Sequence, residues 1–422
     1  MAARAMSVSS PDRRSPAWRH ALAVVAAVML LTSSAVAVAT SWTGAWGAAP
    51  QPPVASGWSQ AGFAGHSLRQ VVRLSTGGSA LRLRLSNRYG TAPLQVAGAA
   101  VGRAGSGAEV RGVPVAVTFG RAPGTVIPPG REIVSDAVRL PARALERVAV
   151  TLYFAAPTGP ATFHEVASAT SFRARGDHRF TAGAAPYTET SGSWYFLTGV
   201  DALGAARGSV VAFGDSITDG TGSSLDADNR YPDQLAERLA ASGRRLGVLN
   251  SGLSGNRLLD DSPCFGEKAV TRFRRDVLDR PGVRSVIVMA GINDIGSLLG
   301  VQPCFVPGAR LTAERLIQGH RLLIGAARES GVRIIGGTIV PFRGSPFAYS
   351  EEGERVRATV NTWIRTSGEY DAVADFERAL AGPDGRLRPE YNARDGRPGD
   401  FLHPNDAGLD AMAAAIDLSL LE

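Results

Sequence analysis

One serine stands where the nucleophile of an acyl-transfer reaction would be needed. Residues 214–220 read GDSITDG and directly follow the apolar run 210–213. If that run is a buried strand, the Ser216 hydroxyl lies at the carboxyl edge of a sheet, beside the backbone N–H groups of the turn. Serine is a weak nucleophile and needs a base. The same residue types also build ordinary turns, so Ser216 alone leaves both interpretations open.

A base for Ser216 occurs near the end of the chain. Residues 400–406 read DFLHPND, which places Asp400 three residues before His403 and both just before a predicted helix. An aspartate that accepts a hydrogen bond from one imidazole nitrogen leaves the other nitrogen to take a proton. The structural alternative is that Asp400 and Asn405 only cap the helix.

Two further loops offer hydrogen-bond donors. Gly255 lies in the segment 250–256, NSGLSGN, and glycine lets a backbone amide approach a ligand without a Cβ in the way. Asn293 lies in the segment 291–294, GIND, and its neutral amide suits a developing oxyanion. An ordinary glycine loop and a helix cap are the alternatives. Together the four segments supply complementary roles and predict serine-dependent acyl transfer that needs no metal or cofactor.

The elements that carry these motifs alternate between strand and helix from about residue 207 onward. The apolar patterns predict strands at 210–213, 248–250, 286–290, 332–340 and 372–376. Helical spacing appears at 231–242, 311–330, 356–366 and 407–421. Such alternation predicts an α/β fold with a parallel sheet covered on both faces, whose ligands bind at the carboxyl ends of the strands.

The first half of the chain predicts a different architecture. Between residues 67 and 196, leucines and valines alternate with polar residues, and glycine, proline and asparagine clusters interrupt the pattern. This indicates a β-sandwich, jelly-roll-like, with no long helix. Four aromatic residues are candidates for stacking on sugars or, alternatively, for the core: Trp58, Phe163, Trp194 and Tyr195.

The N-terminus resembles an export signal. Basic residues precede an apolar run at 21–38, and Ala37-Val38-Ala39 fits a small-x-small cleavage site, so we predict a signal peptide at 1–39 and a secreted, extracellular protein. An uncleaved anchor is the alternative. The sandwich is then expected at 40–200 and the α/β domain at 205–422.

Cysteine content and charge narrow the remaining functions. Cys264 and Cys304 are the only cysteines, and in an exported chain they are expected to form a disulfide. The net charge is +7, but the arginines are scattered, which argues against a nucleic-acid partner. No stable membrane partner is expected after cleavage. The segment 272–276, RFRRD, predicts a solvated helix face with weak ion pairs.

At 207–421 the four motifs resemble those of the SGNH superfamily, also called GDSL esterases and lipases. The resemblance implies a three-layer α/β/α domain, flavodoxin-like, with a five-stranded parallel sheet. It implies Ser216, His403 and Asp400 as catalytic triad, and an oxyanion hole made by Ser216, Gly255 and Asn293. Ile217 replaces the leucine of the family's nickname, as many members allow.

The resemblance also points to a substrate class. Asp219 and the segment 229–233, NRYPD, resemble a xylan-esterase-like branch, and a β domain before such a domain is similar to two-domain carbohydrate esterases. A small-molecule or polysaccharide ester with a short acetyl group is therefore expected. One alternative is a lipase or phospholipase with a lid at 296–307. The other is a carbohydrate-binding or adhesion protein with a vestigial hydrolase domain. The sequence leaves the oligomeric state open.

Overall fold

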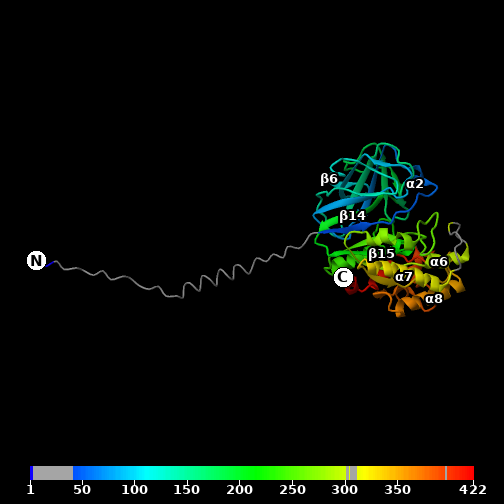
Figure 1. Ribbon diagram of the computed structural model, residues 1–422. Helices are drawn as coiled ribbons and strands as arrows, with labels where there is room; N and C mark the ends of the chain where they lie inside the picture. Colours follow the sequence, from blue (N-terminus) through cyan, green and yellow to red (C-terminus); the bar gives the residue numbers. More distant parts are fainter. Residues whose placement is uncertain (3–40, 301–303, 305–310, 395–396) are drawn as a thin grey trace. The chain divides into compact units, whose positions relative to one another are not determined.

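The computed structural model of the chain describes residues 1–2, 41–300, 304, 311–394 and 397–422 (Figure 1). All but the first two residues of the predicted signal peptide lie outside this part. Residues 40–422 form one compact unit. No helix in the described part combines the length and apolar character needed to cross a bilayer.

Antiparallel sheets build the first half of this unit, as the alternating pattern predicts. A six-stranded sheet has the order β12 (Glu189–Ser191), β11 (Ser171–Arg175), β2 (His66–Arg73), β9 (Arg147–Phe154), β5 (Gly98–Ala104) and β6 (Val110–Val117). A four-stranded sheet has the order β1 (Ser41–Gly47), β14 (Leu197–Gly204), β3 (Ala80–Ser86) and β8 (Glu132–Val134). Two short pairs complete the set, β10 (Phe163–His164) with β13 (Trp194–Tyr195) and β4 (Leu94–Val96) with β7 (Thr125–Ile127).

The core of this sandwich is apolar and aromatic. Leu81, Leu83 and Leu85 are fully buried, because alternate residues of a strand face the same side. Phe163, Trp194 and Tyr195 are also buried and belong to the same core, while Trp58 packs against it. These aromatic side chains therefore serve the core, and the alternative that the three buried ones stack on sugars is excluded.

The first strand was not foreseen, since the strand pattern was predicted to begin only at residue 67. β1 pairs antiparallel with β14, Trp42 opposite Leu203. Its sequence, SWTGAWG, contains small residues instead of an apolar alternation. A Cβ on Gly44 would lie only 2.7 Å from a methyl carbon of Leu249, so glycine lets β1 lie against the neighbouring parallel sheet.

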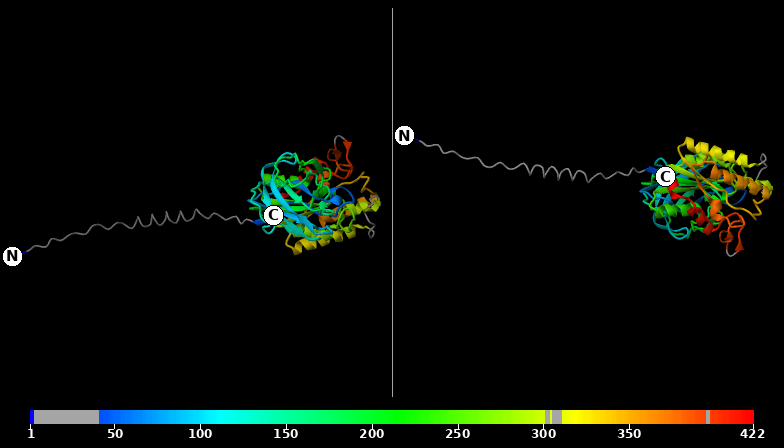
Figure 2. Two further views of the ribbon diagram at one scale, coloured as in Figure 1. Left: turned by 90° about the horizontal axis from the view of Figure 1, so that it is seen from above. Right: turned by 90° about the horizontal axis from the view of Figure 1, so that it is seen from below.

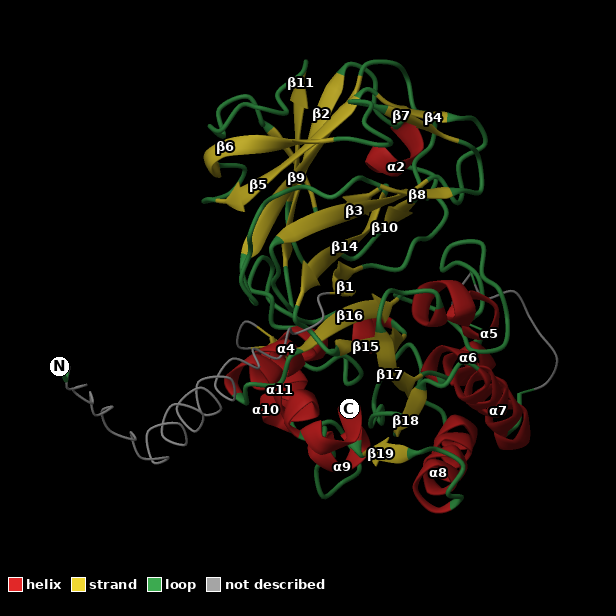
Figure 3. Ribbon diagram, turned by 60° about the vertical axis from the view of Figure 1, so that its left-hand side comes forward, coloured by secondary structure: helices red, strands yellow, loops and turns green. Residues whose placement is uncertain are grey.

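The second half is a five-stranded parallel sheet with helices on both faces, as predicted (Figure 3). Its order is β16 (Leu246–Gly252), β15 (Gly208–Gly214), β17 (Val283–Met289), β18 (Arg333–Gly337) and β19 (Ala372–Ala374). The two central strands each contain a fully buried apolar run, 210–213 in β15 and 286–289 in β17, as strands covered on both faces should. Viewed from above the sandwich strands lie in front, and viewed from below the helices do (Figure 2).

The longer helices are amphipathic and flank this sheet. Among the described elements, α4 (Tyr231–Ala241), α9 (Phe376–Leu380) and α11 (Asp406–Ala414) cover one face, and α5 (Ala269–Phe273), α7 (Ala313–Glu329) and α8 (Glu351–Thr366) cover the other (Figure 3). The other helical segments are α2 (Gly57–Ala61), α3 (Ser216–Asp219), η1 (Arg274–Leu278), α6 (Ile292–Gly296), η2 (Ser297–Leu299), α10 (Pro389–Asn392) and η3 (Leu418–Leu421). β20 (Ala393–Arg394) and β21 (Arg397–Pro398) pair antiparallel.

Several predicted boundaries differ from the structure: the strand predicted at 332–340 is β18 at Arg333–Gly337, and the helix predicted at 356–366 is α8 at Glu351–Thr366. Two other differences have a local cause. β19 stops at Ala374 because Asp375 accepts a hydrogen bond from Arg378 N and caps α9. The strand predicted at 372–376 therefore includes two residues that belong to the cap and the first turn of α9. The closing helix ends at Ala414, and the remaining apolar residues form the turn η3.

Candidate active site

Register in the parallel sheet brings three of the predicted loops together. Gly214, the last residue of β15, pairs with Gly252 of β16 on one side and with Met289 of β17 on the other. The loops after these strands therefore leave the sheet at adjacent points on its carboxyl edge. Ser216 opens the short helix α3, where its backbone N–H lacks an intrahelical acceptor.

Ser216, His403 and Asp400 form one chain of hydrogen bonds. Ser216 Oγ lies 2.8 Å from His403 Nε2. His403 Nδ1 lies 2.6 Å from Asp400 Oδ2, and the backbone N–H of His403 donates to Asp400 Oδ1 at 2.9 Å. Because a carboxylate only accepts, Nδ1 carries the proton and Nε2 is left to accept the serine hydroxyl.

The charge of Asp400 is stabilised by its neighbours. Burial alone would raise the pKa of Asp400, but hydrogen bonds and charge from His403 and a hydrogen bond from Leu402 N outweigh burial and hold that pKa well below its usual value. Asp400 is therefore ionised at neutral pH. The alternative that Asp400 is a helix cap fails, since Asn405 caps α11.

Gly255 and Asn293 line the same pocket as Ser216. Gly255 has a φ of 72°, and a Cβ there would lie 2.3 Å from the ring of Phe265, so only glycine fits. Asn293 Nδ2 donates one hydrogen to Asn256 O at 3.0 Å, which fixes the amide and leaves its second hydrogen for a ligand. Gly291, not Asn293, occupies the N-cap of α6, so the capping alternative does not apply.

Two buried aspartates support these loops. Asp294 accepts from the backbone N–H groups of Leu258 and Leu259, which fixes the chain that leads away from Gly255. Burial raises the pKa of Asp294 to about 6. Burial likewise raises the pKa of Asp215 to about 7, although Asp215 accepts from Ile217 N. Sequence reasoning assigned neither aspartate a role.

The expectation of a solvated face at 272–276 is wrong for Arg272 and Asp276, although Arg274 is exposed. Arg272 and Asp276 are fully buried and paired, with Nη1 and Oδ2 3.2 Å apart. The guanidinium donates to Gly214 O at 2.7 Å and to Ser251 O at 2.9 Å. Arg272 therefore ties the ends of β15 and β16 together. Its spacing of four from Asp276 was visible in the sequence, but only tertiary packing decides that this face points inward.

A pocket of about 370 Å³ opens above Ser216 and His403. Its walls come from several loops, and two wall residues, Glu165 and Val166, belong to the sandwich. The remaining lining is mostly small or apolar: Thr221, Ser254, Gly255, Phe265, Asn293, Gly296, Phe347, Ala348 and Leu402. In the described part of the chain, no cluster of three or more histidine, cysteine or acidic side chains is placed to hold a metal ion.

A disulfide borders this pocket, as predicted for the two cysteines. Cys264 and Cys304 are bonded, with Cα atoms 5.7 Å apart. Cys264 O accepts from Gln51 Nε2 at 3.3 Å, which connects the segment before Phe265 to the sandwich. Half of the segment 296–307, the candidate lid of the lipase alternative, lies outside the described residues.

Comparison with known proteins gives this constellation a family context. Residues 212–411 match the model of the GDSL-like lipase/acylhydrolase family. A search of curated proteins returned no match.

Solved structures that resemble the chain are similar over about half of it. A GDSL-like lipase from Bacteroides thetaiotaomicron VPI-5482 is 18% identical over 50% of this chain and 86% of that chain, with a TM-score of 0.36. The acetyl xylan esterase AlAXEase is 18% identical over 49% of this chain and 96% of that chain, with a TM-score of 0.37. The aryl esterase of M. smegmatis is 18% identical over 49% of this chain and 94% of that chain, with a TM-score of 0.37.

Proposed function

We propose that this chain, a carboxylic ester hydrolase with a GDSL-like lipase/acylhydrolase domain at 212–411, hydrolyses short acyl esters of carbohydrates through Ser216, His403 and Asp400. The observation that carries the proposal is the hydrogen-bond chain from Ser216 Oγ through His403 to Asp400 at the floor of a pocket.

The reaction is acyl transfer in two steps. Ser216 Oγ attacks the ester carbonyl while His403 Nε2 takes the hydroxyl proton, and Asp400 stabilises the resulting imidazolium. The backbone N–H groups of Ser216 and Gly255 and the free N–H of Asn293 stabilise the oxyanion. His403 then protonates the leaving alcohol, and a water molecule attacks the acyl-enzyme by the same sequence of proton transfers.

The size of the pocket supports a short acyl chain. At about 370 Å³ it stands near the lower end of ligand sites, roughly 300–1,000 Å³, and it must also hold part of the alcohol. Glu165 at the wall accepts hydrogen bonds, as a sugar hydroxyl requires. Both features favour an acetylated carbohydrate over a long-chain lipid.

Replacing the nucleophile tests the reaction. We expect Ser216→Ala to abolish release of p-nitrophenol from its acetate ester, and Asn293→Ala to lower kcat by about 10²–10³ because one oxyanion donor is lost. Ser223→Ala is the matched control, since Ser223 lies in the same segment and bonds to Gly220 O outside the pocket lining. Retained activity in pure Ser216→Ala protein would reject the mechanism.

An acyl-length panel tests the substrate class. We expect kcat/KM to be highest for acetyl esters, and acetate to be released from acetylated xylan. A preference for chains of about eight carbons or more would instead support the lipase alternative.

Export is part of the proposal. The predicted signal peptide and the disulfide between Cys264 and Cys304 both suit an extracellular protein. N-terminal sequencing of protein from the medium should begin at Thr40, and a thiol assay of the native protein should find no free cysteine. A retained leader or two free thiols would contradict export in this form.

A further inference from the structure

The sandwich segment that lines the pocket is fastened to the catalytic loops by a buried histidine. His164, in β10, lies one residue before Glu165, and its Nε2 lies 2.8 Å from Oδ1 of Asp219 at the end of α3. The two side chains are only 4% and 2% exposed. A charge pair this deeply buried is costly unless its remaining hydrogen-bonding atoms are also satisfied.

The partners of His164 determine its protonation. Nδ1 lies 2.9 Å from Ala49 O, and Nε2 faces the Asp219 carboxylate and, at 3.2 Å, Val166 O. Carbonyl and carboxylate oxygens only accept, so both ring nitrogens carry protons and His164 is an imidazolium.

The electrostatic surroundings agree with this geometry. Burial lowers the pKa of His164, but the charge and hydrogen bond of Asp219 outweigh burial and raise it above the usual value. The positive charge of the nearby Arg230 lowers the pKa of His164 but does not outweigh Asp219. Both groups contact the ring of Trp194, which stacks on the imidazole at 5.4 Å between centroids.

Asp219 connects His164 to the oxyanion loop, because each of its carboxylate oxygens bonds to one of them. Its second oxygen, Oδ2, accepts from Ser254 N at 3.0 Å and from Ser254 Oγ at 2.9 Å. Ser254 directly precedes Gly255, and Asp219 lies three residues after Ser216 in the same short helix. Asp219 thus fixes the distance between the two backbone amides assigned to the oxyanion hole.

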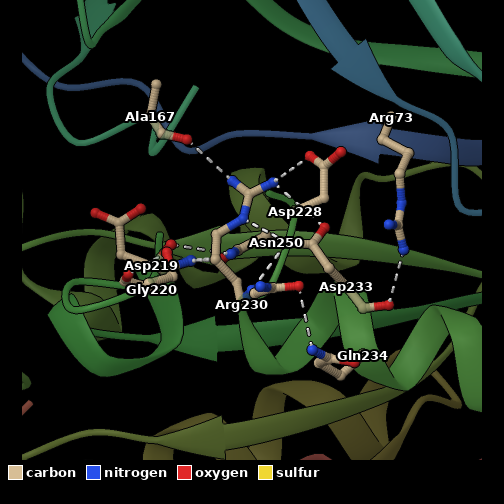
Figure 4. A network of polar contacts seen from close by, with 12 residues as sticks. Arg73, Ala167, Asp219, Gly220, Asp228, Arg230, Asp233, Gln234 and Asn250 are labelled. Carbon is tan, nitrogen blue, oxygen red and sulfur yellow. Dashed lines mark hydrogen bonds and ion pairs between the residues drawn. The ribbon is translucent and has the colours of Figure 1, made fainter. Parts of the chain in front are cut away.

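Arg230 fastens the same sandwich segment at a second point (Figure 4). Its Nη1 donates to Ala167 O at 3.3 Å, while its charge is balanced by Asp233 at 2.6 Å and Asp228 at 3.9 Å. A Cβ on Gly220 would lie 2.1 Å from Arg230 Cγ, so the turn after α3 is shaped to admit this side chain.

We propose that the charged His164, contributed by the sandwich, is a positioning residue for ester hydrolysis: through Asp219 it holds Ser254 and Gly255 in the geometry that stabilises the oxyanion. The inference rests on the proposed function. The sandwich is then a structural part of the active site, and the role of Asp219 is to connect His164 to Ser254.

The test compares two buried histidines. Full loss of one oxyanion donor costs about 10²–10³ in turnover and a displaced donor costs less, so we expect His164→Gln to lower kcat on p-nitrophenyl acetate about 10- to 100-fold. KM should stay within about twofold, because a displaced oxyanion donor affects the transition state. The control is His320→Gln, since His320 is equally buried but bonds to Tyr370 in the helical layer. His320→Gln should lower Tm but leave kcat unchanged, where kcat is expressed per active site as titrated with a fluorophosphonate.

Each outcome supports or rejects the positioning role of His164. If kcat per titrated site in His164→Gln equals that of the wild type, the inference fails while the proposed function stands, because the latter depends on Ser216→Ala. If His164→Gln does not fold, Ser254→Ala provides the test, since it removes the hydroxyl that donates to Asp219 and also contacts Thr221 Oγ1, and it leaves the backbone donor Ser254 N in place. Its kcat should fall about fivefold, the effect of one net hydrogen bond, at constant KM. Unchanged kcat in Ser254→Ala would overturn the route through Asp219.

Discussion

Asp400 shows how a single residue can serve both the proposed chemistry and the local fold. Its two oxygens accept three N–H groups, from the ring and backbone of His403 and from the backbone of Leu402. These bonds select the tautomer of His403 that can accept the proton of Ser216. They also make the free energy of unfolding depend on pH, because Asp400 binds its proton more weakly in the folded chain than in the unfolded one.

Asp400→Asn is expected to lower kcat by up to about 10⁴, because the amide allows the wrong tautomer of His403. The variant should also change acid stability. A depressed folded pKa stabilises the fold above the unfolded pKa of about 3.9, and this contribution is lost as pH falls below about 4. Urea unfolding from pH 7 to pH 2 should therefore show a shallower acid loss in Asp400→Asn than in the wild type. Asp410→Asn, on the exposed side of α11, should match the wild type in both assays.

At the scale of elements, the site is assembled from loops whose backbone shape is fixed by neighbouring side chains. The loop after β16 needs a left-handed residue at Gly255 and a ring, Phe265, packed against it. The ends of β15 and β16 are held by the buried guanidinium of Arg272.

Gly255→Ala and Gly243→Ala form a matched pair. Both glycines have a φ of 72°, but a Cβ on Gly243 meets no atom within 4 Å, whereas one on Gly255 meets the Phe265 ring at 2.3 Å. Each alanine should cost about 1–2 kcal/mol of stability for the left-handed backbone. Only Gly255→Ala should also lower kcat, because the ring displaces the oxyanion amide. Equal kcat values for the two variants would contradict this account.

The buried pair of Arg272 and Asp276 predicts a large effect on stability. Asp276→Asn removes the carboxylate from a fully buried guanidinium and is expected to lower the free energy of unfolding by about 3–5 kcal/mol. Glu369→Gln breaks the partly exposed pair with Arg321 and should cost at most about 1 kcal/mol. Urea titrations of both variants measure the difference, and similar costs would show that Arg272 does not depend on Asp276.

At the scale of the whole molecule, the sandwich and the α/β half share a polar and apolar boundary. Val248 N donates to Ser75 Oγ at 2.7 Å, and Arg73 pairs with Glu237 at 2.6 Å. Tyr89 donates to Glu267 at 2.9 Å near the pocket. With the His164 contact, these bonds make residues 40–422 one compact unit.

This boundary predicts a single cooperative unfolding transition. Leu83→Ala in the sandwich core and Leu235→Ala in the α/β core should each lower the Tm of that one transition, because both leucines are fully buried and such truncations cost about 2–5 kcal/mol. Calorimetry should give equal calorimetric and van't Hoff enthalpies. Two resolved transitions, each sensitive to one variant, would contradict the prediction.

The sequence by itself determined the class of each half and the residues that meet at the sheet edge. Strand alternation at 81–85 identified the sandwich, and apolar runs followed by glycine, serine and asparagine identified the loops of Ser216, Gly255 and Asn293. These inferences succeeded because periodicity and strand direction follow from local backbone geometry. The spacing of Asp400 and His403 also suffices for one contact, since three residues of turn bring the two side chains together.

Only the tertiary structure decided which polar residues are buried and which distant segments touch. The sequence pattern predicts a solvated Arg272, but helix packing places this side chain in the interior. β1 has no alternating pattern because its small residues let it lie close to the neighbouring sheet. His164 and Asp219 are separated by 55 residues, so nothing local connects them. Burial and long-range pairing depend on how whole elements pack. This is the physical reason that a motif could indicate the proposed nucleophile, Ser216, but not the histidine that we propose positions the oxyanion loop.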